Sequence, residues 1–353
     1  MLEQLAAISI VLLMGCAAVV SAANESPSDP APRSQTQLTN IKNADPSVIG
    51  VGSTYYSVES DGNNIYVREA PSPNALDNAA RVKISGSKPN VWAPEIVKVG
   101  STFYVYFAAG NLIDQRMYYV SSTDPTSGYS SATPMNLPDS KWAIDGVPFQ
   151  FNKEWWFVWS GWAGNTNIEQ NLYIARMSDP TTVTGGRFII SQPRERWERS
   201  VGNPYINEGP QPIKDPNGQL HIVYSANGSW STDYCLGDLR LVSGGEPTNI
   251  RDWYKSNGCL FGAKKDLMTK GLDPTLNAKG VGHHSFVLPS GDISTSPSSG
   301  AASPFMYHGV PNNVQMSWSN RYWYTGTFTW WENSTYCRSR SDCNTGWSLK
   351  FLE

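Results

Sequence analysis

The segment Val99-Gly-Ser-Thr-Phe-Tyr-Val-Tyr106 is a turn followed by a run of aromatic and β-branched residues. Glycine-containing turns that lead into such residues are typical of β-hairpins. Three further segments repeat the pattern, beginning at Val51, Asn152 and Asn217. A chain that repeats one hairpin unit is predicted to be all-β and built from similar modules.

A second element follows the hairpin in two of the units. It is Met117-Tyr-Tyr-Val-Ser-Ser-Thr-Asp-Pro125 in one and Leu172-Tyr-Ile-Ala-Arg-Met-Ser-Asp-Pro180 in the other. A period of roughly 50 residues with about four strands is typical of a β-propeller blade. Residues 40–353 would then fold as one propeller domain of about five or six blades. The alternative is a two-sheet sandwich, which does not require the repeat to recur at this spacing.

The composition limits what the chain can bind. Only 16% of the 353 residues are charged, 12% are aromatic, and the formal net charge is -3. Binding nucleic acid by neutralising its phosphates needs a dense basic surface, so we expect no nucleic-acid partner. No basic tail is present either, and we expect no membrane partner. A hydrophobic content of 40% can bury a large core and excludes a disordered chain.

The N-terminal residues predict a secreted, extracellular protein. An apolar run over residues 6–20 ends in Val20-Ser21-Ala22, a small-residue pattern typical of signal-peptide cleavage. The run is shorter than the ~20 residues that span a bilayer as a helix. We expect a signal peptide over residues 1–22 and a flexible, Pro- and Ser-rich lead-in over residues 23–39. An uncleaved membrane anchor is the alternative.

The cysteines and glycosylation sequons suit the same compartment. Cys16 lies in the predicted signal peptide, and the remaining four cysteines allow three pairings. Short loops close at the lowest entropic cost, which favours Cys235–Cys259 and Cys337–Cys343. The sequence has no CxxC pair, so zinc or redox chemistry is not expected. Three Asn-x-Ser/Thr sequons predict N-linked glycans, at Asn24, Asn227 and Asn333.

Acidic residues recur in step with the repeated units. Each lies in a short apolar segment ahead of one turn-and-strand unit, at Asp45, Glu95, Asp145 and Glu208. The first strand of each propeller blade lines the central axis, so these carboxylates would converge there. Converging carboxylates suit glycosidic-bond hydrolysis, in which one protonates the leaving oxygen and another activates water, and a nearby like charge keeps the acid protonated. Taken singly, each of them could instead open a turn or carry a rim charge.

Five motifs around these residues resemble glycoside hydrolase family 43, in the order and spacing of that family. They span roughly residues 40–310 and are Asn43-Ala-Asp-Pro46, Trp92-Ala-Pro-Glu95, Asp145-Gly146, Asn207-Glu-Gly-Pro210 and Gly280-Val-Gly-His-His-Ser-Phe286. Segments 159–162, 170–178 and 224–237 look like the arabinofuranosidase branch rather than the xylosidase branch. The histidine motif departs from the usual family pattern at Val281, where Pro is common, and at His284, where Asn is common.

The resemblance implies a five-bladed propeller and an inverting mechanism. Asp45 would be the general base, Glu208 the general acid, and Asp145 would tune the pKa of the acid and orient it. His283 would lie in the central channel near a cation, often calcium, and would hold it directly or through water. The alternative is a buried His283 with no metal. No cofactor is implied for the chemistry itself.

Aromatic side chains beside the acids would stack on the C–H faces of sugar rings. The candidates lie within or just after the motifs, and they are Trp92, Trp162 and Trp230. Glu95, Gln170 and His283 are the predicted polar contacts to substrate. A salt-bridged structural role is the alternative for Glu95.

We therefore predict a secreted, monomeric hydrolase that removes terminal α-L-arabinofuranosyl residues from plant arabinan or arabinoxylan, with exo action on α-1,5-linked arabinan favoured. An endo-arabinanase and a β-xylosidase are the alternatives among enzymes. The alternative from another class is a carbohydrate-binding propeller without turnover. Such a module would need the aromatic residues but not three carboxylates in phase with the blades.

Overall fold

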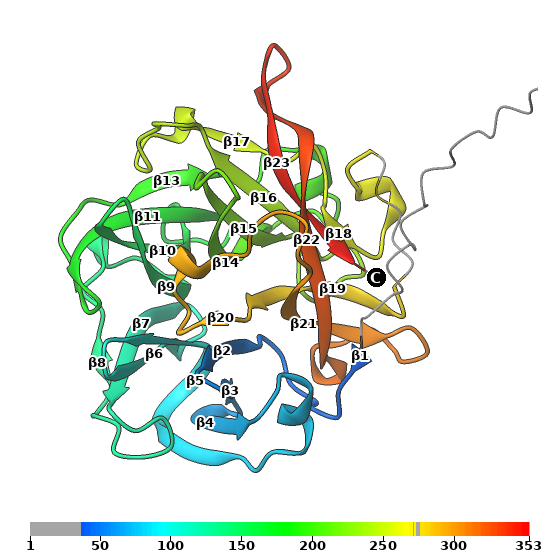
Figure 1. Ribbon diagram of the computed structural model, residues 1–353. Coiled ribbons are helices and arrows are strands. Elements are labelled where there is room, and N and C mark those ends of the chain that lie inside the picture. Colours follow the sequence, from blue (N-terminus) through cyan, green and yellow to red (C-terminus); the bar gives the residue numbers. More distant parts are fainter. Residues whose placement is uncertain (1–36, 271, 273–275, 353) are drawn as a thin grey trace, which may run out of the picture. The chain divides into compact units, whose positions relative to one another are not determined.

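The computed structural model describes residues 37–270, 272 and 276–352 (Figure 1). These residues form β-strands joined by turns and short 3-10 helices, and this part of the chain is therefore all-β, as the repeated hairpins predict. The predicted signal peptide, most of the predicted lead-in, Cys16 and Asn24 lie outside the described residues. Over the described ranges, no helix has both the length and the apolar character that crossing a membrane requires.

The first half of the chain forms antiparallel strands that follow one another in sequence. The first run comprises β2 (Ser47–Val51), β3 (Thr54–Ser60), β4 (Gly62–Ala70) and the start of β5 (Val82–Val99). The rest of β5 leaves β4 and begins a second run, with β6 (Thr102–Asn111), β7 (Asp114–Ser122) and β8 (Thr133–Pro134). One long strand thus serves two runs (Figure 1).

Three further runs follow within the described residues. One comprises β9 (Ala143–Phe151), β10 (Glu154–Trp162), β11 (Glu169–Asp179), β12 (Thr182–Val183) and β13 (Phe188–Ser191). The next comprises β14 (Tyr205–Lys214), β15 (Leu220–Ala226), β16 (Cys235–Leu241), β17 (Trp253–Lys255) and β18 (Phe261–Gly262). The last comprises β19 (Ala278–Phe286), β21 (Ser303–Pro311), β22 (Tyr322–Ser339) and β23 (Asp342–Leu352).

Short 3-10 helices connect or flank these strands. They are η1 (Asn74–Asn78), η2 (Pro138–Ser140), η3 (Arg196–Glu198), η4 (Ile250–Asp252), η5 (Lys265–Leu267), η6 (Ile293–Thr295) and η7 (Trp318–Asn320). Their brevity agrees with the sequence, in which Gly, Pro, Asn and Asp interrupt every apolar run before a helical stripe can develop.

The first strands of the runs contact one another in a closed order. β2 contacts β5, β5 contacts β9, β9 contacts β14, β14 contacts β19, and β19 contacts β2 again. Because each of these strands begins a different run, residues far apart in the sequence meet where the strands face one another. This arrangement brings the motif residues together.

Apolar side chains fill the spaces between neighbouring runs. Every residue of β15 and of β16 is buried, so both faces of these strands are covered. Phe261 of β18 packs edge-on against Phe305 and Tyr307 of β21, with ring centroids 5.4 and 4.8 Å apart. Aromatic pairs of this kind contribute about 0.5–1.5 kcal/mol beyond the apolar area they bury. The aromatic-rich composition is thus used largely for contacts between runs.

The start of the described chain is tied to its last run. The short strand β1 (Gln37–Leu38) pairs with β22. Trp323 of β22 then donates its backbone N–H to Ile41 and its indole N–H to the carbonyl of Ala44, at 3.0 and 2.8 Å. In addition, β20 (Leu288–Pro289) pairs in parallel with β2. The segment that leads into Asp45 is therefore held by residues near the other end of the chain.

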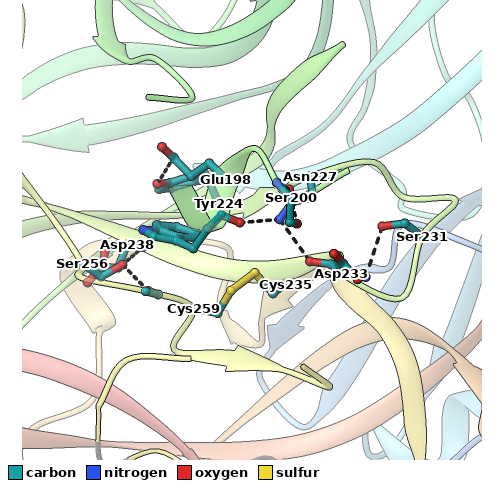
Figure 2. Close-up of a disulfide and its surroundings, with 12 residues drawn as sticks. Glu198, Ser200, Tyr224, Asn227, Ser231, Asp233, Cys235, Asp238, Ser256 and Cys259 are labelled. Carbon is teal, nitrogen blue, oxygen red and sulfur yellow. Dashed lines mark hydrogen bonds between the residues drawn. A yellow bond between two sulfur atoms is a disulfide. The ribbon is translucent and has the colours of Figure 1, made fainter. Parts of the chain in front are cut away.

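Both expected disulfides are present, Cys235–Cys259 and Cys337–Cys343 (Figure 2 shows the first). The glycosylation prediction at Asn227 conflicts with the place of this residue in the fold. Asn227 is only 1% exposed, and its amide nitrogen donates to the carbonyls of Trp197 and Asp233, so a glycan there would break both hydrogen bonds. Asn333, in contrast, is exposed on β22, and a glycan there stays a prediction.

Candidate active site

Two neighbouring cavities open where the first strands of the runs meet. The larger has a volume of about 430 Å³, and its lining includes Asp45, Asp145, Glu208 and His283. The smaller has a volume of about 390 Å³ and is lined mainly by polar residues of the segments around Asn43, Ser60 and Ser319. Both cavities share Asp45, Trp92, Trp318 and Arg321. Asp45 thus faces both cavities, whereas Glu208 faces only the larger one.

A left-handed residue recurs on these first strands. Positive φ angles of 41° to 57° occur at Ala93, Asp145, Gly209 and His283, and the register of each strand against its neighbour shifts at the same point. Asp45, just ahead of β2, has a φ of 51°. Such bulges bend a strand and redirect a side chain, and non-glycine residues held at positive φ are frequent at functional sites.

The bulges correct one detail of the sequence interpretation. The positions that match from run to run are 45, 93, 145, 209 and 283. Glu95 lies two residues beyond the left-handed position, and it faces away from the cavities. It is 3% exposed, accepts a hydrogen bond from Gln211 at 2.9 Å, and lines neither the larger nor the smaller cavity. The position of Glu95 therefore does not support a contact with sugar.

Glu208 on β14 accepts a hydrogen bond on each of its oxygens. Gln170 of β11 donates to Oε2 and the Tyr234 hydroxyl donates to Oε1, both at 2.9 Å. Burial nevertheless raises the pKa of Glu208 above its ordinary value. A carboxyl group whose pKa is raised and whose two oxygens are both oriented is suited to act as a general acid.

Asp145 on β9 lies beside the acid. Its Oδ2 accepts the backbone N–H of Gly209 at 2.9 Å, which ties β9 to the residue directly after Glu208. Burial and the like charge of Glu208 raise the pKa of Asp145 to about 8, despite the opposing charge of His283. The two carboxyl groups therefore compete for ionisation, and their protons are coupled.

Asp45 has the opposite electrostatic environment. Its Oδ1 lies 3.3 Å from His283 Nδ1, 3.1 Å from His308 Nδ1 and 3.8 Å from a guanidinium nitrogen of Arg321. Burial alone would raise the pKa of Asp45, but these positive and hydrogen-bonding groups hold it well below its usual range. Asp45 is therefore ionised over the whole physiological range, as a base that activates water must be.

His283 lies between carboxylates and does not fit a directly bound cation. Its Nδ1 faces Asp45 and its Nε2 lies 3.7 Å from Glu95 Oε1. Burial favours the neutral ring, but Asp45 and Asp145 raise the pKa of His283 to about 10. Both nitrogens thus carry a proton and face a carboxylate. No group of three or more His, Cys, Asp or Glu side chains within the described ranges is placed to hold a metal ion.

The predicted aromatic contacts all line the larger cavity. Trp162 stacks face to face on Trp142, with centroids 4.6 Å apart and 9° between the rings. Trp230 meets Trp318 edge-on at 6.0 Å, and Trp92 lies at the boundary with the smaller cavity. Gln170 and His283 line the larger cavity as well. Tryptophan side chains that line a cavity beside carboxyl groups suit the C–H faces of a sugar ring.

Sequence reasoning missed several residues of the site, namely Trp142, Tyr234, His308, Trp318 and Arg321. None of them lies in a repeated motif. Trp318 belongs to η7 and Arg321 follows it, and both precede β22 in a segment that no motif covers. One signal was available for Tyr234, because it directly precedes a cysteine that was predicted to form a disulfide.

A cavity lined by tryptophans, in which burial raises the pKa of one carboxyl group and neighbouring groups lower that of another, has the features that glycosidic-bond hydrolysis needs. The family model described as glycosyl hydrolases family 43 matches residues 37–293. The chain belongs to this family.

Relatives and solved structures agree with that assignment. An extracellular exo-alpha-(1->5)-L-arabinofuranosidase of Streptomyces avermitilis is 30% identical over 70% of this chain and 52% of the relative. An alpha-L-arabinofuranosidase B of Pyricularia oryzae is 26% identical over 73% of this chain and 56% of the relative. This chain thus spans about half the length of both relatives.

A second Streptomyces enzyme, from Streptomyces chartreusis, bears the same name as the first relative. It is 26% identical over 67% of this chain and 72% of its own length. Among solved structures, an alpha-L-arabinofuranosidase from Lactobacillus brevis superposes with a TM-score of 0.70 at 24% identity, covering 84% of this chain and 93% of the other. This structural likeness supports the fold.

Proposed function

We propose that the protein is a secreted, inverting α-L-arabinofuranosidase that removes terminal residues from α-1,5-linked arabinan, and also from arabinoxylan. The observation that carries this proposal is the placement of Asp45, whose pKa is held low, and Glu208, whose pKa is raised by burial, around one cavity lined by tryptophans. The names of the Streptomyces relatives support arabinofuranosyl residues as the substrate and an extracellular location.

In the proposed reaction, Glu208 gives its proton to the glycosidic oxygen as the bond from that oxygen to the anomeric carbon breaks. Asp45 removes a proton from a water molecule, whose oxygen forms the new bond on the opposite face of the sugar. The two cavities suit this division of labour. A sugar in the larger cavity leaves Asp45 in contact with the smaller one, from which water can reach it.

Asp145 is proposed to regulate the acid. The ionisations of Asp145 and Glu208 are coupled, so a charge on one carboxyl group disfavours a charge on the other, and the hydrogen bond from the Gly209 N–H to Asp145 fixes the backbone next to the acid. His283 carries the balancing positive charge between Asp45 and Glu95. No step in this mechanism passes through a metal ion.

The five runs of strands are proposed to be the blades of a five-bladed propeller. The closed order of contacts among β2, β5, β9, β14 and β19 supports this. Residues 40–353 would form this single catalytic domain, preceded by a signal peptide at residues 1–22 and a lead-in at residues 23–39. We propose a monomer that acts on plant cell-wall polysaccharide or on arabino-oligosaccharides.

The test is hydrolysis of p-nitrophenyl α-L-arabinofuranoside beside the β-xyloside, with wild type, Glu208→Gln and a matched variant at an exposed glutamate, Glu332→Gln. We expect the arabinoside to be cleaved by wild type and Glu332→Gln but not by Glu208→Gln. Proton NMR of the first product should show the inverted anomer. Binding of arabinan without release from either glycoside would instead identify a carbohydrate-binding module.

Endo action is the second candidate, because the smaller cavity continues the larger one and shares two tryptophans with it. Reduced α-1,5-arabinopentaose distinguishes the two modes. Exo action releases arabinose alone at early times, whereas endo action produces di- and trisaccharides first.

A further inference from the structure

Tyr234 connects the surroundings of the acid with those of the base. Its fully buried side chain donates from the hydroxyl to Glu208 Oε1 at 2.9 Å. The ring stacks on His308 with centroids 5.5 Å apart and 5° between the planes. His308 in turn lies 3.1 Å from Asp45. Tyr234 and His308 thus connect the two proposed catalytic carboxyl groups, with Tyr234 at Glu208 and His308 at Asp45.

A glycine makes room for this ring. A Cβ atom at Gly282 would lie 2.3 Å from the Tyr234 ring, so any other residue there would displace the tyrosine or the strand. Gly282 directly precedes His283 on β19. The second glycine of the histidine motif is therefore required because the Tyr234 ring occupies the space that a side chain would need.

The backbone on both sides of Tyr234 is anchored. Before it, the amide of Asn227 donates to the Asp233 carbonyl at 3.1 Å, and the Ser231 hydroxyl accepts the Asp233 N–H at the same distance (Figure 2). After it, Cys235 is bonded to Cys259. These contacts restrict the hydroxyl to a small volume beside Glu208.

We propose that Tyr234 is a positioning residue for the general acid, an inference that rests on the proposed function. In the ground state its hydroxyl orients the protonated Glu208. As Glu208 transfers its proton to the glycosidic oxygen it becomes a carboxylate, and a hydrogen bond to a charged acceptor is stronger than one to a neutral acceptor. The interaction therefore strengthens in the transition state, which raises kcat without tightening substrate binding.

The test is Tyr234→Phe, which keeps the ring on His308 and removes only the hydroxyl. Three substrates differ in how strongly the leaving oxygen needs a proton. The need is greatest for methyl α-L-arabinofuranoside, smaller for the p-nitrophenyl glycoside and smallest for the 2,4-dinitrophenyl glycoside. We expect kcat to fall about 10- to 100-fold on the methyl glycoside. It should fall less than about 3-fold on the dinitrophenyl glycoside, which departs without a proton. KM should stay within about 2-fold throughout.

Tyr224→Phe is the matched control, because Tyr224 is equally buried and its hydroxyl donates to Glu198 at 2.7 Å, away from the cavities. We expect this variant to show no dependence on the leaving group. An equal loss on all three substrates in Tyr234→Phe, or no loss, overturns the proposal. Full activity of Glu208→Gln on the methyl glycoside would contradict the proposed function itself, which keeps the two failures distinguishable.

Discussion

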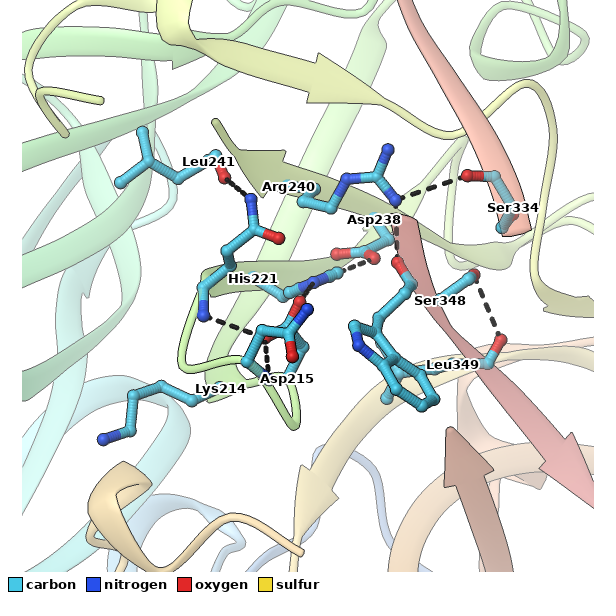
Figure 3. A network of polar contacts seen from close by, with 12 residues as sticks. Lys214, Asp215, His221, Asp238, Arg240, Leu241, Ser334, Ser348 and Leu349 are labelled. Atoms are coloured by element: carbon cyan, nitrogen blue, oxygen red, sulfur yellow. Dashed lines mark hydrogen bonds and ion pairs between the residues drawn. The ribbon is translucent and has the colours of Figure 1, made fainter. Parts of the chain in front are cut away.

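The described residues contain two clusters of acidic side chains and histidine, and the clusters differ in what surrounds them. One is the cavity cluster of Asp45, Asp145, Glu208 and His283. The other joins Asp215, His221 and Asp238 between β14, β15 and β16, and we call it the sealed cluster (Figure 3). His221 Nδ1 lies 2.7 Å from Asp238, and Tyr336 of β22 donates to the same carboxylate at 2.8 Å.

The same residue types therefore perform different tasks. The side chains of Asp215, His221 and Asp238 are fully buried, lie at ordinary φ angles and line neither of the two cavities. Asp45, Asp145 and His283 lie at positive φ, at or beside strand bulges, and open onto a cavity. Backbone strain and access to solvent, more than residue type, separate the proposed catalytic cluster from the sealed cluster.

The largest effect should come from Asp45→Asn. Without an ionised base, kcat should fall by roughly 10³-fold or more, while the free energy of unfolding falls by only about 1–2 kcal/mol, because His283 and Arg321 lose one charged partner. Activity on the p-nitrophenyl arabinofuranoside and urea unfolding measure the two quantities. If stability fell as steeply as activity, Asp45 would belong with the sealed cluster and the contrast would be lost.

Asp238→Ala should do the opposite. It leaves His221 and the Tyr336 hydroxyl without their buried acceptor, which should cost about 3–5 kcal/mol of the free energy of unfolding. The kcat of the folded fraction should stay within about 2-fold, because the cluster lies outside the cavities. The exposed Asp342, paired with Arg338, supplies the control, since Asp342→Ala should cost less than about 1 kcal/mol. A stable but inactive Asp238→Ala variant would show that the sealed cluster serves activity rather than stability.

A smaller effect is expected from Asp145→Asn. Because the two carboxyl groups compete for ionisation, removing Asp145 leaves Glu208 to titrate alone, and the basic limb of the kcat/KM profile should move to lower pH. The maximal kcat/KM should also fall, by about 10-fold, as the Gly209 contact weakens. The profile between pH 4 and 9 checks both effects. An unmoved basic limb would leave Asp145 a purely structural residue.

The smallest effect concerns the pH dependence of stability. Burial opposes the charged ring, but Asp238 and Asp215 raise the pKa of His221 above 6.5. Its contribution to stability is therefore complete below pH 6.5 and is lost as the pH rises through the higher folded value. Urea unfolding from pH 6 to 9 should show a steeper decline for wild type than for His221→Gln. Parallel curves would mean that His221 is neutral in the sealed cluster.

The sequence predicts the all-β chain and the meeting of Asp45, Asp145 and Glu208, because the hairpin repeat and the acidic residues share one period. It misplaces Glu95, since the bulge at Ala93 turns the strand before that residue and no repeat reveals which way a bulge points. The burial of Asn227 could not be predicted either, because a sequon does not show whether the asparagine amide forms hydrogen bonds inside the folded chain.

The partners of the carboxylates are harder to predict. His308, Arg321 and Tyr234 lie outside the repeated motifs, and their roles depend on which runs become neighbours in space. His221 shows the reverse difficulty. It lies within a repeated hairpin unit, yet its neighbours Asp215 and Asp238 make it part of the sealed cluster.

The tie between the start of the described chain and β22 has a consequence for biosynthesis. Asp45 follows Ala44, whose carbonyl accepts the Trp323 indole, and it is flanked by His308 and Arg321. The ribosome makes Asp45 early and these partners more than 260 residues later. In a nascent chain Asp45 therefore cannot take up this orientation until β21 and the segment that leads into β22 have been translated.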